Sequence, residues 1–85
     1  MYELSIHGMG AQRFNLEFGT EEIKFKNTTI KEIKEKLIRE QALPLNTDDI
    51  RLIFAGKQLN DDETVSSCDI NNKSTIMSVT RVRGG

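Results

Sequence analysis

Hydrophobic and polar residues alternate near the start of the chain in a way that predicts a β-hairpin. Residues 2–7 and residues 13–18 each alternate apolar and polar side chains. This period of two is typical of a strand with one buried face. The segment between them contains Gly8 and Gly10, which suit a tight loop. We therefore expect two antiparallel strands within the first eighteen residues.

A helix is expected from residue 29 to about residue 41. Thr29 precedes Glu32 by three positions, which is the spacing of a capping box. Apolar residues then recur at helical spacing, at Ile30, Ile33, Leu37 and Ile38. The charged residues that we expect to face water are Lys31, Lys34, Glu35 and Arg39. Pro44 cannot continue a helix, so the helix ends before it.

Residues 19–28, between the hairpin and the helix, are harder to assign. The segment Ile23-Lys24-Phe25-Lys26 alternates briefly. It is either a short extra strand or a flap that buries both apolar side chains.

The second half of the chain predicts further strands. Residues 50–55 alternate and end at Gly56, and Gln58-Leu59 is a candidate for a very short strand. Residues 64–70 are expected to form a tight turn that buries Val65 and Ile70, and residues 76–82 are rich in β-branched side chains. A hairpin, a helix and then strands predict an α+β fold with one mixed sheet wrapped around one helix.

Composition places the chain among small soluble globular domains. It has 85 residues, 36% hydrophobic and 29% charged, with a net charge of −1. This balance does not favour a nucleic-acid or membrane partner. The N-terminus does not resemble a signal peptide, and the single Cys68 cannot form an internal disulfide. We expect a cytoplasmic or nuclear protein.

The residues that enzymes use are scarce. The chain has one histidine, His7, and one cysteine, Cys68, far apart in sequence with no evident third partner. Their number and spacing do not fit a zinc site, and no phosphate-binding or calcium-binding loop is present. We expect no catalytic residue, no metal and no cofactor.

The segment Arg51–Leu59 resembles ubiquitin. Its nine residues, RLIFAGKQL, are the same as the third-strand segment of that protein, and residues 81–85, RVRGG, resemble its C-terminus. Relative to ubiquitin, the chain has extra residues around positions 21–26 and 46–48. Residues 64–69 are more similar to the ubiquitin-like domain of the ligase parkin, where a Cys-Asp pair also occurs. The resemblance covers nearly the whole chain and identifies it as a divergent ubiquitin-like protein.

This resemblance implies a β-grasp roll over residues 1–80, followed by a flexible tail, residues 81–85. It also implies an exposed apolar recognition patch made by Met9, Ile53 and Val79, with Gly56 and Arg51 beside it. Strand alternation independently directs Ile53 outward if Ile50, Leu52 and Phe54 face the helix.

The last strand presents a conflict. Directing Val79 outward places the polar Ser78 inward, where its hydroxyl needs a hydrogen-bond partner. Directing Met77 and Val79 inward instead would remove Val79 from the patch. We favour the first arrangement, because the resemblance aligns this segment without a gap.

The resemblance implies conjugation as well. Activating, conjugating and ligating enzymes would act on the Gly85 carboxylate, with Gly84 threading a narrow channel and Arg81 and Arg83 as docking charges. The chain would be a monomer read by ubiquitin-binding domains or proteasome receptors. The resemblance also implies three possible acceptor lysines for chain formation, Lys57, Lys36 and Lys34.

A conjugated protein modifier is therefore the favoured function. The alternative is a non-conjugated ubiquitin-like domain of a larger protein, such as a ligase or a proteasome shuttle. A thiol enzyme and a sulfur carrier are two further classes, and the residues favour them less. Gly84-Gly85 favours the modifier, whereas Cys68-Asp69 favours the alternative.

Overall fold

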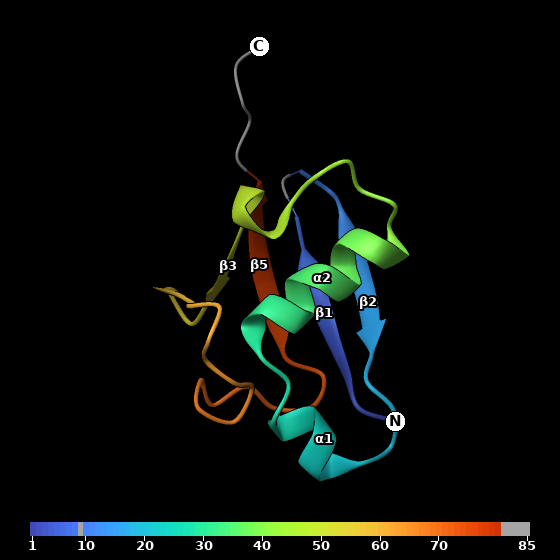
Figure 1. The fold of residues 1–85 in the computed structure, drawn as a ribbon, viewed down its shortest axis with the longest axis vertical. Coiled ribbons are helices and arrows are strands. Elements are labelled where there is room, and N and C mark those ends of the chain that lie inside the picture. The colour runs from blue at the N-terminus through green and yellow to red at the C-terminus, as the bar shows by residue number, and fades with distance from the viewer. Residues whose placement is uncertain (9, 81–85) are drawn as a thin grey trace.

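A five-stranded mixed sheet is the scaffold of the molecule (Figure 1). The computed structural model describes residues 1–8 and 10–80. The strands are β1 Glu3–His7, β2 Arg13–Glu17, β3 Ile50–Phe54, β4 Lys57–Gln58 and β5 Thr75–Thr80. They follow the order β2-β1-β5-β3-β4, in which β1 and β5 are parallel and the other pairs antiparallel. The expected α+β fold is confirmed.

The N-terminal hairpin forms as the alternation predicts. β1 and β2 pair with Leu4 opposite Leu16 and Ile6 opposite Phe14. Leu4, Ile6 and Leu16 are buried, whereas the residues between them point to the other side of the sheet. The Gly8 amide donates to the Gln12 carbonyl across the turn at 2.9 Å. Burial of one face therefore fixes the register of the pair.

The main helix, α2, spans Ile30–Glu40 and crosses one face of the sheet (Figure 1). Its predicted capping box is present: the Glu32 amide donates to Thr29 Oγ1 at 3.2 Å, and the Thr29 amide donates to Glu32 Oε1 at 3.0 Å. The next two free amides, of Ile30 and Lys31, donate to the carbonyls of Glu63 and Asp61 at 2.9 and 3.1 Å. The free backbone amides at the start of α2 are thus hydrogen-bonded by the helix's own capping box and by a segment distant in sequence.

The core lies between α2 and the sheet. The helix contributes Ile30, Ile33 and Leu37, all buried. The other buried apolar residues come from the strands and loops: Leu4, Ile6, Leu16, Phe25, Ile50, Leu52, Leu59, Val65, Ile70 and Ile76. These include Val65 and Ile70, which the sequence predicted to be buried by the turn at residues 64–70.

The prediction that residues 23–26 form a short strand or a flap that buries both apolar side chains is wrong. The segment forms a short helix, α1, over Glu22–Lys26. Residues two apart lie on different sides of a helix. Phe25 is accordingly buried against the rings of Tyr2 and Phe18, at centroid distances of 5.0 and 5.7 Å, whereas Ile23 is 74% exposed.

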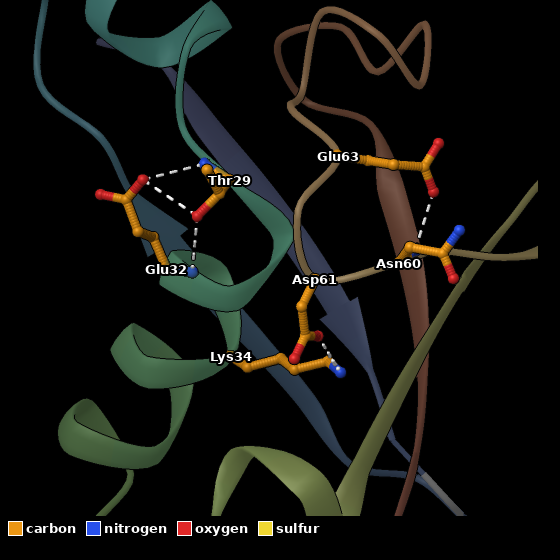
Figure 2. A network of polar contacts seen from close by, with 6 residues as sticks. All are labelled: Thr29, Glu32, Lys34, Asn60, Asp61 and Glu63. Carbon is orange, nitrogen blue, oxygen red and sulfur yellow. Dashed lines mark hydrogen bonds and ion pairs between the residues drawn. The ribbon is translucent and has the colours of Figure 1, made fainter.

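The expectation that Lys34 faces water is also wrong. Its side chain is 8% exposed, and its Nζ lies 2.6 Å from Asp61 Oδ1, which belongs to the segment that caps α2 (Figure 2). A buried ammonium needs such a partner, because an unpaired charge in the interior is expensive. Lys34 and Asp61 therefore help to hold residues 60–64 against α2.

The turn between β3 and β4 explains why β3 ends where it does. Ala55 and Gly56 both have positive φ, 53° and 76°. Two such residues in succession are the requirement of the type I′ turn that favours a tight hairpin. The last described strand ends at Thr80, so the expected continuation to residue 82 lies outside the described residues. No described helix has the length and apolar character that crossing a membrane requires.

The ion pair predicts an asymmetry between two substitutions. Asp61→Asn leaves the Lys34 ammonium buried without an anion, so it should lower the free energy of unfolding by about 1–3 kcal/mol. Lys34→Met removes the buried charge, and the Asp61 side chain, 40% exposed, is hydrated instead. Lys34→Met should therefore cost less than about 1 kcal/mol. Urea denaturation measures both. An equal or larger cost for Lys34→Met would contradict this account of the pair.

Candidate recognition surface

The face of the sheet opposite α2 carries the alternate side chains of every long strand. Across it runs one row of neighbours fixed by the strand pairing: Arg13 on β2, His7 on β1, Met77 on β5, Ile53 on β3 and Gln58 on β4. A second, shorter row pairs Arg51 with Val79. We call Arg51, Ile53, Met77 and Val79 the outer patch. None of the described helices covers it in Figure 1.

The register of β5 is the one that places Val79 outward. Ile76 and Ser78 are buried, whereas Met77 is 56% and Val79 38% exposed. Ser78 lies opposite the buried Leu52, and Val79 lies opposite the exposed Arg51, across β3 and β5. Paired residues of the two strands therefore point to the same side of the sheet. The conflict in this strand is therefore resolved with Ser78 on the inner side and Val79 on the exposed side.

The other residues expected in the patch are placed as follows. Ile53 is half-buried between Met77 and Gln58, and Arg51 is exposed. Gly56 is exposed in the turn that follows β3. It is close to Ile53 in sequence but belongs to neither row of paired residues. Met9 lies outside the described residues, as do Arg81, Arg83, Gly84 and Gly85.

Met77 and His7 are members of the row that the sequence did not place in the patch. Their adjacency depends on the parallel pairing of β1 with β5, which joins segments 70 residues apart. Any register that directs Val79 outward also directs Met77 outward, so the sequence contained enough information to include Met77 in the patch. Nothing in the local pattern indicates that His7 lies next to it.

The outer patch has a basic border. Arg51 lies within it, and Arg13 ends the longer row on β2. The ion pairs of the described residues use other cations, namely Lys24, Lys26, Lys34 and Lys36. Arg13 and Arg51 are therefore available to an acidic partner. An apolar centre with a charged rim is the usual anatomy of a protein-binding surface.

The three candidate acceptor lysines lie in different environments. Lys57 is exposed at the start of β4 and makes no ion pair with a described residue. Lys36 is half-buried: its Nζ lies 2.7 Å from Glu40 Oε2 and 5.4 Å from the centroid of the Phe18 ring. Lys34 is buried against Asp61. Because a nucleophilic amine must reach solvent, burial counts against Lys34.

Cys68 lies in the segment that packs near the end of β3. It is half-buried and lines a cavity of about 260 Å³ together with Phe54, Leu59 and Lys57. Burial raises the pKa of the Cys68 thiol, against a smaller opposite effect of a hydrogen bond with Ser67. A raised pKa disfavours the thiolate, which is the nucleophilic form. Among the described residues, no group of three or more His, Cys, Asp or Glu side chains is arranged to hold a metal ion.

Comparison with known proteins agrees with this architecture. The model of the Ubiquitin family matches residues 20–83. Parkin of Mus musculus, an E3 ubiquitin-protein ligase, is 37% identical over 71 residues, which are 84% of this chain and 15% of parkin. The chain thus spans about one seventh of the parkin sequences it matches.

Two shorter proteins are similar over most of their own length. The ubiquitin-like protein NEDD8 of Dictyostelium discoideum is 38% identical over 56 residues, covering 66% of this chain and 70% of NEDD8. Ubiquitin-like protein 1 of Schizosaccharomyces pombe is 34% identical over 59 residues, covering 69% and 73%. With its mixed sheet around one main helix, a β-grasp fold, this chain belongs to the ubiquitin family.

Proposed function

We propose that the chain is a ubiquitin-like protein modifier, recognised through the outer patch and attached to substrate lysines through the Gly85 carboxylate. The observation that carries recognition is the set of outward side chains on β5 and β3, of which Met77 and Val79 remain exposed. Single exposed apolar residues are common, but three neighbours on an uncovered sheet face form a surface suited to a partner.

The partner that fits the outer patch is an amphipathic segment with acidic residues beside its apolar face. Its apolar side chains would cover Ile53, Met77 and Val79, and its carboxylates would lie near Arg51 and Arg13. Ubiquitin-binding domains and proteasome receptors are the expected carriers of such segments.

Conjugation is supported by the sequence of residues 81–85. Glycine has no Cβ, so Gly84-Gly85 can enter a channel that side chains would block. An activating enzyme would use ATP to adenylate the Gly85 carboxylate, releasing pyrophosphate, and its cysteine would then displace AMP to form a thioester. A lysine amine finally displaces the thiol. A protein that extended beyond Gly85 would need cleavage there first.

The nucleophiles in this scheme belong to the partner enzymes and substrates, so the chain itself is proposed to be non-enzymatic. Of the three candidate acceptor lysines, Lys57 is the best suited to chain formation, because it is exposed and makes no ion pair with a described residue, whereas Lys36 and Lys34 are ion-paired.

The second candidate is a non-conjugated recognition domain within a larger protein. The similarity to parkin favours it, because the matched region is a small part of that ligase. Both candidates use the outer patch, and they differ only in whether Gly85 reacts.

Ile53→Ala should weaken binding to a ubiquitin-interacting motif peptide by at least about tenfold, because it truncates an apolar anchor at the centre of the patch. Isothermal titration calorimetry measures the affinity. Thr75→Ala, which points to the same side of β5 outside the patch, is the matched control and should bind normally. Unchanged affinity of Ile53→Ala would exclude the patch as the binding surface.

The same variant also tests the placement of Ile53. Because Ile53 is half-buried, truncation should lower the free energy of unfolding by less than about 1.5 kcal/mol, whereas core truncations cost about 2–5 kcal/mol. A cost in the core range would show that the side chain faces the interior.

Conjugation separates the two candidates. Incubation with ATP and the host's activating enzymes should give an adduct that a thiol reductant removes, detected on a non-reducing gel. Deletion of Gly85 should abolish it, because the carboxylate no longer reaches the enzyme. Gly84→Ala should also block it, and Arg81→Ala should reduce it more mildly. Lys57→Arg is the control that keeps the adduct. No adduct with the complete set of activating enzymes would favour the non-conjugated domain.

The reactivity of Cys68 tests whether the chain is a thiol enzyme, because such an enzyme would need an activated thiol. Since burial raises the pKa of this thiol, a smaller fraction is thiolate at neutral pH than in an exposed cysteine. Iodoacetamide should therefore modify Cys68 more slowly than N-acetylcysteine at pH 7, and the rate should rise as the pH is raised, as followed by mass spectrometry. Faster modification than N-acetylcysteine would indicate an activated nucleophile.

A further inference from the structure

Met77 is the most exposed apolar side chain of the outer patch. It is 56% exposed, against 38% for Val79, and Ile53 is half-buried. Met77 lies on β5 between His7 of β1 and Ile53 of β3, and it is paired with both in the sheet. Its side chain therefore occupies the middle of the longer row, and a partner that covers the outer patch covers this side chain as well.

The side chain of Met77 differs in chemistry from the other apolar members of the patch. Ile53 and Val79 carry hydrocarbon side chains, whereas a methionine thioether is oxidised to a sulfoxide. Hydrogen peroxide supplies the oxygen: the sulfur lone pair attacks one peroxide oxygen, the O–O bond breaks, and the other oxygen leaves as water after proton transfer. The sulfur is oxidised and the peroxide is reduced, so no further reactant is needed. Because Met77 is exposed, peroxide reaches its sulfur without unfolding of the chain.

Oxidation of this sulfur changes what the outer patch can bind. A sulfoxide is polar, and its oxygen accepts hydrogen bonds. An apolar side chain of a partner offers no donor to that oxygen, and burial of a polar group without a hydrogen-bond partner is unfavourable. The fold should be little affected, because Met77 does not belong to the hydrophobic core. Oxidation should thus weaken recognition and leave the domain folded.

The other sulfur-containing residues do not share this position. Met1 is also exposed, at 62%, but it precedes β1 and belongs to neither row of the outer patch. Cys68 is half-buried, and burial raises the pKa of its thiol, which lowers the fraction of reactive thiolate. Met9 lies outside the described residues. Among the described residues, only Met77 has a sulfur that is both exposed and within the outer patch.

We propose that Met77 is a reversible oxidation site that controls recognition through the outer patch. The thioether form binds the amphipathic, acidic partner segment, and the sulfoxide form binds it weakly. This inference rests on the proposed function, because it assigns a regulation to the same surface. Methionine sulfoxide reductases return the sulfoxide to the thioether, while two thiols are oxidised to a disulfide and the oxygen leaves as water.

The test is isothermal titration of the full chain with a methionine-free ubiquitin-interacting motif peptide, before and after treatment with hydrogen peroxide. Peptide mass spectrometry locates and quantifies the sulfoxide. Oxidation of Met77 should weaken binding by about tenfold, the effect expected of one buried polar group without a partner. Methionine sulfoxide reductases A and B, which reduce one sulfoxide epimer each, should restore the affinity. Unchanged affinity with Met77 fully oxidised, or a loss that the reductases do not reverse, would overturn the proposal.

Met77→Leu is the matched variant, because leucine is apolar, has a similar volume and is not oxidised by peroxide. The variant keeps Met1, Met9 and Cys68, so it reports what oxidation of those three residues does. Its affinity for the peptide should be the same before and after peroxide treatment. A loss as large as in the unsubstituted chain would assign the effect to another residue and overturn the proposal.

The rate of oxidation gives a readout that does not depend on affinity. Saturating peptide should slow the oxidation of Met77 but not that of Met1, because the bound partner covers only the former. Equal rates for Met77 with and without peptide would contradict the proposal. The amide spectrum of the ¹⁵N-labelled, oxidised protein should remain dispersed, with shifts confined to the outer patch. A loss of dispersion would show that oxidation unfolds the chain, and it would also overturn the proposal.

These measurements separate failure of this inference from failure of the proposed function. If the untreated protein does not bind the peptide, both the proposed recognition and this inference fail. If it binds and oxidation of Met77 leaves the affinity unchanged, only this inference fails.

Discussion

The structure depends on one constraint: α2 covers a single face of the mixed sheet. The helix is fixed there at its start, where the amides of Ile30 and Lys31 bond to the carbonyls of Glu63 and Asp61 and the buried Lys34 pairs with Asp61. Because side chains alternate along a strand, packing one set against α2 leaves the other set on a face that no described helix covers. The core and the candidate recognition surface are therefore two consequences of the same register.

The two sides of β5 show how closely these consequences are linked. Met77 and Val79 stand on the uncovered face, where they adjoin Ile53 and Arg51. Between them, Ser78 points inward and lines a cavity of about 200 Å³. A slip of one residue would bury Met77 and Val79 and expose Ile76 and Ser78, and it would destroy the patch. The pairing of β5 with β1 and β3 holds the strand in the register that keeps the patch.

Much of this could be predicted from the sequence, because the signals were local. The capping box of Thr29 and Glu32 and the burial of Val65 each follow from patterns within a few residues. The outward direction of Val79 was predicted only with the help of the family resemblance, because alternation alone allowed either register. The helical form of residues 22–26 could not, since two apolar residues two apart fit a strand equally well. The burial of Lys34 depends on Asp61, 27 residues away, and the adjacency of His7 and Met77 depends on a parallel pairing between the chain's two ends.

The central claim is that the uncovered face of β3 and β5 is the surface by which this ubiquitin-family chain is recognised. It is tested most directly by titrating the ¹⁵N-labelled protein with an unlabelled ubiquitin-interacting motif peptide and mapping the amide shifts onto the sheet. The account predicts that the largest shifts cluster at Arg51, Ile53, Met77 and Val79 and that α2 is little affected. Shifts concentrated on the exposed side of α2, with Ile53 and Val79 unchanged, would contradict it.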